Sequence, residues 1–151
     1  MREIKFCGKS IESCEWIYGY YYRGEIDPSK HFIICMESYN DYEVDPETIG
    51  QYIELHDKND KEIFEKDIVK FVGGTTSHLS CGNYESNKHE IGTVLIVKKL
   101  KSGFTLQKST HIKLDSPNLV GNVSNYDLWN HHRSLEIIGN IHDNPELIDA
   151  A

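Results

Sequence analysis

Short runs of alternating polar and apolar residues recur along this chain of 151 residues, and they predict strands. Clusters of Gly, Pro, Asn, Asp and Ser separate the runs, as is typical of turns. The predicted strands cover residues 1–6, 16–22, 31–36, 52–56, 61–64, 67–72, 91–98, 103–107 and 135–141. Helical patterning is limited to isolated turns. The chain is therefore predicted to be mainly β with minor α.

One short connecting helix is predicted after the third strand. Asp45 is a good N-cap residue, Pro46 suits the first helical position, and Gly50 ends the helix after one or two turns. This helix separates a small N-terminal β-rich subdomain, residues 1–50, from a C-terminal part, residues 51–151.

The C-terminal part contains about five short strands joined by turns. Such an arrangement favours a small barrel over an open sheet, because closure removes exposed strand edges. The strand order is similar to that of an SH3-like barrel. Residues 73–90 are polar and rich in Gly, Ser, Asn and His, so we interpret them as a long mobile loop.

An aromatic run in the second predicted strand is the most distinctive feature of the N-terminal part. Alternation along the strand places one set of its rings on a shared face: Trp16, Tyr18, Tyr20 and Tyr22. Core packing or an ordinary sheet surface is the commoner role of such rings. A base-stacking platform would need Arg and Lys around it, which this segment lacks. If the protein binds a partner through this segment, these four residues are the candidates.

The charge is negative and unevenly distributed. The net charge is −8, of which −5 falls within residues 1–50. The densest acidic group has no basic residue among its members: Glu37, Asp41, Glu43, Asp45 and Glu47. These are further candidate partner-binding residues, although solvated surface is the alternative. Such a field repels a phosphate backbone, and the best basic stripe is short: Lys98, Lys99, Lys101 and Lys108. Nucleic acid is therefore not the expected partner.

Composition narrows the class of protein further. Hydrophobic residues make up 38% of the chain, with nine Tyr, five Phe and two Trp, so a folded domain is expected. No apolar run approaches the roughly 20 residues of a membrane-spanning helix, and the start does not look like a signal peptide. We expect a cytoplasmic protein without a membrane association. Its four cysteines, Cys7, Cys14, Cys35 and Cys81, are expected to be reduced thiols.

Candidate catalytic chemistry is sparse. Cys81 with His78 or His89 is the one nucleophile and base pairing to consider, but all three lie in the predicted mobile loop, which would orient them poorly. The Gly73-Gly74 segment lacks the lysine of a phosphate-binding loop. No pair of ligands has the close spacing of a zinc site. We therefore predict no enzymatic activity, no cofactor and no metal site.

Three strings of residues, in order along the chain, carry a resemblance to a known family. They are residues 44–52, 57–69 and 137–147, and residues 2–6 and 16–19 add to them. Together they resemble the YopX-like family of bacteriophage and prophage proteins, over nearly the whole chain. That family usually has Gly where Asp60 and Lys66 stand, which leaves the shape of those two turns open.

The resemblance implies a phage setting in the bacterial cytoplasm, but it supplies no catalytic residue. We therefore expect a non-enzymatic accessory protein that acts through protein contacts. In one form of this hypothesis, its acidic surface inhibits a host or defence factor. The alternatives are a self-assembling oligomer that packs through its aromatic N-terminal part, and a weak nucleic-acid-binding barrel. The first of these is compatible with the accessory role, so we expect a homo-oligomer, with a host or phage protein as a possible further partner.

Overall fold

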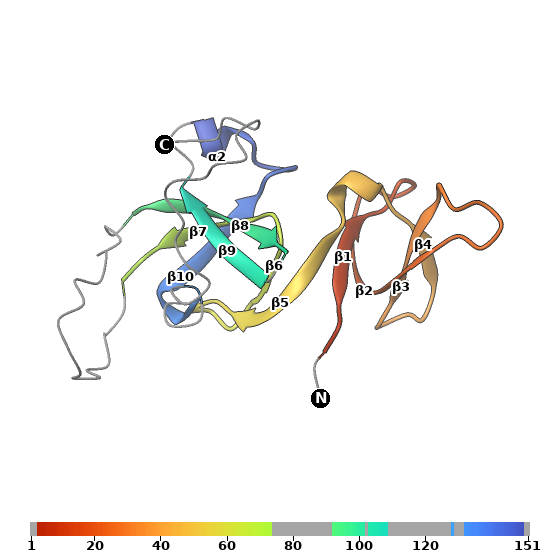
Figure 1. Cartoon of the computed structure of the whole chain (residues 1–151), viewed down its shortest axis with the longest axis horizontal. Coiled ribbons are helices and arrows are strands. Elements are labelled where there is room, and N and C mark those ends of the chain that lie inside the picture. Colours follow the sequence, from red (N-terminus) through yellow and green to blue (C-terminus); the bar gives the residue numbers. More distant parts are fainter. Residues whose placement is uncertain (1–2, 74–91, 102, 109–127, 129–131, 150–151) are drawn as a thin grey trace. The chain divides into compact units, whose positions relative to one another are not determined.

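A computed structural model describes residues 3–73, 92–101, 103–108, 128 and 132–149 (Figure 1). These residues form two compact units. The first consists of Met1–Glu54 and Glu62–Glu65, and the second of Leu55–Lys61 and Lys66–Ala151. The chain thus passes from one unit to the other three times. The predicted loop at 73–90, except Gly73, lies outside the described residues, and so does most of the segment 109–131.

The first unit is a six-stranded sheet in the order β4-β3-β2-β1-β5-β6. The neighbouring strands from β4 to β5 all pair in antiparallel fashion. The strands are β1 (Phe6–Lys9), β2 (Trp16–Arg23), β3 (His31–Cys35), β4 (Asp41–Glu43), β5 (Gly50–His56) and β6 (Glu62–Phe64). The mainly β fold predicted from the sequence is confirmed.

Strands β1 to β4 curl into a barrel-like layer. A bridge between Ser10 and Val44 brings the end of β4 back to the end of β1. The Ile11 N–H donates to the Glu43 carbonyl (3.0 Å), and the Asp45 N–H donates to the Lys9 carbonyl (2.9 Å). The curl gives each of these strands an inner and an outer face.

The inner face holds the hydrophobic core of this layer. Ile17, Ile33 and Val44 are buried there and pack with Phe6 and Tyr42. Strand β2 approaches β3 closely at Gly19, where a Cβ atom would lie 1.8 Å from the Ile34 carbonyl oxygen. The tight curl therefore depends on the absence of a side chain at this position.

A single 3-10 turn, η1 (Pro46–Thr48), connects β4 to β5. The Asp45 carboxylate accepts a hydrogen bond from the Glu47 N–H (3.0 Å) and caps the turn, as the sequence predicted. The Thr48 hydroxyl accepts a hydrogen bond from the Lys9 N–H (2.8 Å). The turn is thus fixed to the end of β1.

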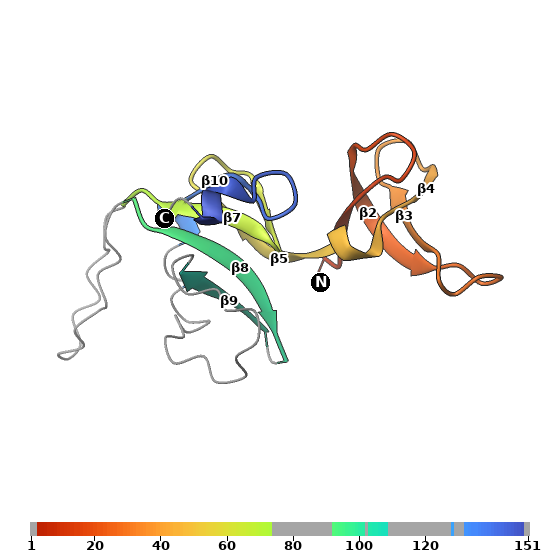
Figure 2. The same ribbon diagram turned by 90° about the horizontal axis from the view of Figure 1, so that it is seen from above.

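The second unit is a four-stranded antiparallel sheet in the order β10-β7-β8-β9 (Figure 2). Its strands are β7 (Asp67–Phe71), β8 (Val94–Leu100), β9 (Gly103–Lys108) and β10 (Leu135–Asn140). A 3-10 turn, η3 (His132–Ser134), precedes β10, and a short helix, α2 (Glu146–Asp149), follows it. Within the described strands β9 does not pair with β10, so the closure of an SH3-like barrel is not seen there.

The core of the second unit lies on this sheet. Its fully buried side chains come from β7, β8, β9 and β10, with one from residue 128: Ile68, Val69, Leu95, Val97, Leu106, Leu128 and Leu135. The register between β7 and β10 shifts between Ile137 and Gly139, an irregularity of the kind that a glycine within a strand favours.

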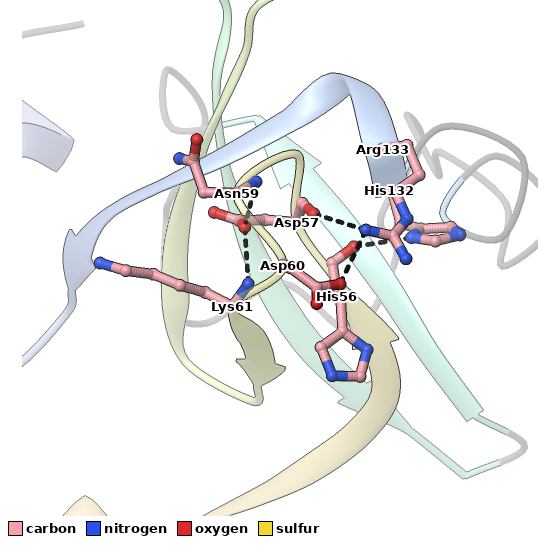
Figure 3. Close-up of polar contacts among 7 residues, drawn as sticks. All are labelled: His56, Asp57, Asn59, Asp60, Lys61, His132 and Arg133. Carbon is pink, nitrogen blue, oxygen red and sulfur yellow. Dashed lines mark hydrogen bonds and ion pairs between the residues drawn. The ribbon is translucent and has the colours of Figure 1, made fainter.

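The turn at residues 57–61 also belongs to the second unit, and it forms around a buried carboxylate. The Asp57 side chain is 0% exposed. Its Oδ1 accepts hydrogen bonds from the N–H groups of Asn59 (2.8 Å) and Lys61 (3.0 Å) (Figure 3). Its Oδ2 accepts one from the Ile137 N–H (3.0 Å), which lies 80 positions further along the chain. One carboxylate thus shapes the turn and attaches it to β10.

Further contacts fasten this turn to η3 and β10. The Lys58 N–H donates to the Leu135 carbonyl (2.9 Å). His132 Nδ1 donates to the His56 carbonyl oxygen (2.6 Å), which can only accept (Figure 3). Arg133 forms an ion pair with Asp60 (3.0 Å), both largely exposed. The Asp57 carboxylate therefore sits at the centre of a wider polar network.

Asp60 and Lys66, where the resembled family usually has Gly, adopt left-handed backbone conformations. Their φ angles are +65° and +75°. Glycine reaches this region without steric cost, whereas a residue with a Cβ atom does not. The two turns therefore have the conformation that glycine favours, although neither residue is glycine.

Replacing Lys66 by glycine is expected to stabilise the protein. The change removes the cost of the left-handed conformation, and we expect the free energy of unfolding to rise by about 0.5–1 kcal/mol. Urea unfolding followed by circular dichroism measures the change. The control is Lys70→Gly, at an exposed position in β7, which should lower stability by a similar amount. Equal losses in both variants would contradict the expectation.

Candidate functional site

Strand β2 presents four aromatic side chains on the outer face of the barrel-like layer. Trp16, Tyr18, Tyr20 and Tyr22 alternate with residues that face the core. Tyr18 is 44% exposed and Tyr20 is 53% exposed, whereas Trp16 and Tyr22 are half-buried. The structure thus places all four predicted residues on one surface.

Strand β3 extends this surface. The register pairs Tyr20 with Ile34 and Tyr22 with Phe32, and both β3 side chains are half-buried. We call the combined surface the aromatic face; it consists of Trp16, Tyr18, Tyr20, Tyr22, Phe32 and Ile34. Phe32 and Ile34 were not among the predicted site residues, because a single sequence does not give the register between two strands. The alternation within residues 31–36 was the available signal.

Two rows of side chains across the aromatic face, one through Tyr20 and one through Tyr22, end in a carboxylate on β4. Asp41 pairs with Ile34, and Glu43 pairs with Phe32. Glu43 also forms an ion pair with Lys30 (3.0 Å) at the surface. Two of the five predicted acidic residues therefore edge the aromatic face.

Contacts within the face orient its rings. Tyr22 stacks on Phe32, with ring centroids 5.3 Å apart and planes at 16°. The Tyr22 hydroxyl donates a hydrogen bond to Asp41 Oδ2 (2.9 Å). This bond to the carboxylate raises the pKa of Tyr22 above its ordinary value of 10.0. The phenol therefore stays protonated and keeps Asp41 in place at neutral pH.

At the Trp16 end of the aromatic face, buried residues of β1, β5 and β6 pack against the rings. Trp16 packs against a buried cluster of Cys7, Tyr52 and Phe64. Tyr18 contacts Phe64 with ring centroids 5.3 Å apart. These contacts cover part of Trp16 and Tyr18, so Tyr20 is the most exposed ring of the face.

The other predicted acidic residues lie elsewhere. Asp45 caps η1, and Glu47 is an exposed residue of that turn. Glu37 is exposed in the turn that follows β3. The structure therefore does not gather the five acidic residues into one site, and it gives Asp45 a structural role.

The first unit carries the entire net charge of the chain. Its segments contain 13 acidic and 5 basic residues, a net charge of −8, whereas the second unit contains 11 of each. A division of the sequence at residue 50 understates this difference in net charge, because Glu54, Glu62 and Glu65 also belong to the first unit. The aromatic face thus lies in a strongly negative surrounding.

The candidates for catalysis lie outside the described residues: His78, Cys81 and His89. Among the described residues, Cys7, Cys14 and Cys35 form no disulfide. Hydrogen bonds from the backbone and hydroxyl of Ser38 and the backbone of Glu37 lower the pKa of Cys35. Across the described ranges, His, Cys, Asp and Glu side chains form no group of three that could hold a metal ion. No helix among these residues is long and apolar enough to cross a membrane.

Comparison with known proteins identifies the family. The model of the YopX protein family matches residues 5–149. The chain belongs to the YopX family. A crystal structure of protein EF1440 from Enterococcus faecalis is similar in fold, with a TM-score of 0.50 and 20% sequence identity, over 98% of this chain and 99% of that one. No curated protein matches this YopX family member.

Proposed function

We propose that this YopX family protein is a non-enzymatic accessory protein of a phage or prophage, and that it binds a basic protein surface through the aromatic face. The observation that carries the proposal is the row in which the exposed Tyr20 ring is followed by Ile34 and then by the Asp41 carboxylate. An interaction surface of this kind combines apolar contact with a fixed negative edge.

The chemistry of the face suits lysine and arginine side chains. Their methylene stems can lie across Tyr20 and Ile34, and their charges can reach Asp41 or Glu43. The net charge of −8 in the first unit adds long-range attraction, which speeds encounter with a positive partner. A partner with an acidic surface would be repelled by these charges.

In its finer form, the proposal names a host or defence factor with a basic groove as the target. An acidic protein that fills such a groove competes with nucleic acid for it, which would make this chain an inhibitor. The protein would then act in the bacterial cytoplasm. The acidic edge would supply the charge, and the rings would supply contact area.

A capture experiment with immobilised variants tests the proposal. Wild type and Tyr20→Ser are incubated with bacterial lysate at physiological salt, and bound protein and nucleic acid are quantified. The matched control is Tyr39→Ser, because Tyr39 is 82% exposed and lies outside the aromatic face. We expect one basic protein bound in stoichiometric amount by wild type and control, and at least tenfold less by Tyr20→Ser. Equal capture by all three would overturn the proposal.

The acidic edge is tested separately with Asp41→Lys/Glu43→Lys. Asp45 is left unchanged, because its carboxylate caps η1 and its loss would disturb the fold. Capture should fall at least tenfold and should weaken in wild type as salt is raised, because salt screens exposed charges. If neither the double substitution nor added salt weakened the capture, the partner surface would not be basic.

A further inference from the structure

The second unit carries a surface with the opposite properties to the aromatic face. The β8–β9 hairpin contains four lysines and no acidic residue from Val94 to Lys108. Near its turn, Lys99, Leu100 and Lys101 are exposed, with Leu100 at 37%. Leu100 is thus an exposed apolar side chain at the end of β8, followed by Lys101 in the turn, while alternation along the strand places Lys99 on the opposite face.

The two surfaces are opposite in charge, and each exposes an apolar side chain. On the aromatic face, an apolar strip at Tyr20 and Ile34 is edged by Asp41. On the hairpin, Leu100 is followed by Lys101 in the turn. Leu100 against the strip would remove apolar area from water, while the positive charge of the hairpin is attracted to the carboxylates on β4.

We propose that the occupant of the aromatic face is the β8–β9 hairpin of a second copy of this chain. This inference rests on the proposed function, because it uses the same face and the same preference for a basic surface. The contact joins two different surfaces, so association is head to tail, and each chain keeps one free surface of each kind. A foreign basic partner would compete with the hairpin for the face.

Sedimentation velocity over a range of protein concentrations tests the proposal. The variants are Lys99→Glu/Lys101→Glu, called the hairpin variant, and Asp41→Lys/Glu43→Lys, called the face variant. Each alone places like charges against one another, so we expect its self-association to be at least tenfold weaker than that of wild type. Lys61→Glu/Lys70→Glu is the control, because it makes the same charge change on the second unit outside the hairpin. It should associate like wild type.

Mixing the two variants gives the decisive result. The hairpin variant retains a native face, and the face variant retains a native hairpin, so the mixture should form complexes that neither variant forms alone. A face-to-face dimer would not be rescued in this way. A wild type that stays monomeric at all concentrations, or a mixture without rescue, would overturn the head-to-tail contact. The Tyr20→Ser capture experiment would still test separately whether the aromatic face binds a foreign basic protein.

Discussion

Replacing Asp57 by alanine is expected to lower the free energy of unfolding by about 3–5 kcal/mol, because it leaves buried donors without an acceptor. The carboxylate accepts hydrogen bonds from the N–H groups of Asn59, Lys61 and Ile137. Alanine offers none of these, and water has little access to a site whose side chain is 0% exposed. The turn at 57–61 would lose its attachment to β10.

Urea unfolding and amide hydrogen exchange measure this effect. The exchange of the Lys61 and Ile137 amides should accelerate far more than that of amides in β2. Asp57→Asn should also destabilise the protein, because its amide nitrogen cannot accept the bond that one carboxylate oxygen accepts now. The control is Asp60→Ala, which removes a neighbouring exposed carboxylate and should cost less than about 1 kcal/mol. Similar losses for Asp57 and Asp60 would refute the central role of Asp57.

Replacing Gly19 by alanine is expected to lower the free energy of unfolding of the first unit by about 3 kcal/mol or more. The added Cβ would lie 1.8 Å from the Ile34 carbonyl oxygen and 2.8 Å from the Ile34 carbonyl carbon. Both are backbone atoms, so the clash cannot be relieved by a change of rotamer. The strands β2 and β3 would have to separate, and the overpacked layer would lose its curl.

The fluorescence of Trp16 at the start of β2 and circular dichroism can follow this change. Tyr20→Ala is the matched control, because it alters the next residue of the same strand on the exposed outer face. It should cost less than the glycine substitution. A variant Gly19→Ala as stable as wild type would show that β2 and β3 can move apart without loss.

Local pattern predicted most of the strands, but it placed the first at residues 1–6, whereas β1 is Phe6–Lys9, and it missed the short strand β4. The period of two in residues 16–22 placed the four rings of β2 on one face, and Asp45 and Pro46 predicted the start of η1. These features depend on neighbours in the chain, so the sequence expresses them directly. The turn at 57–61 was also recognisable from its turn-forming residues.

The long-range features were not predictable in the same way. The bond between Asp57 and the Ile137 N–H joins residues 80 positions apart, and no local pattern encodes it. The bridge between Ser10 and Val44, which curls the first unit, also joins residues that are distant in the sequence. Alternation in residues 52–56 and 61–64 indicated strands, but it did not show that β5 and β6 extend the first sheet. Pairing between distant segments depends on the packing of the whole unit.

The path of the chain through its two units has a consequence for inheritance. Glu62–Glu65 returns to the first unit after Leu55–Lys61 has entered the second, so neither unit is encoded by one uninterrupted stretch of the gene. A single recombination after Glu54 would combine the first 54 residues of one parent with the β6 of the other. A β6 that does not fit would leave β5 as an unpaired edge, which invites aggregation. The two units are therefore expected to be exchanged between genomes together, as one block.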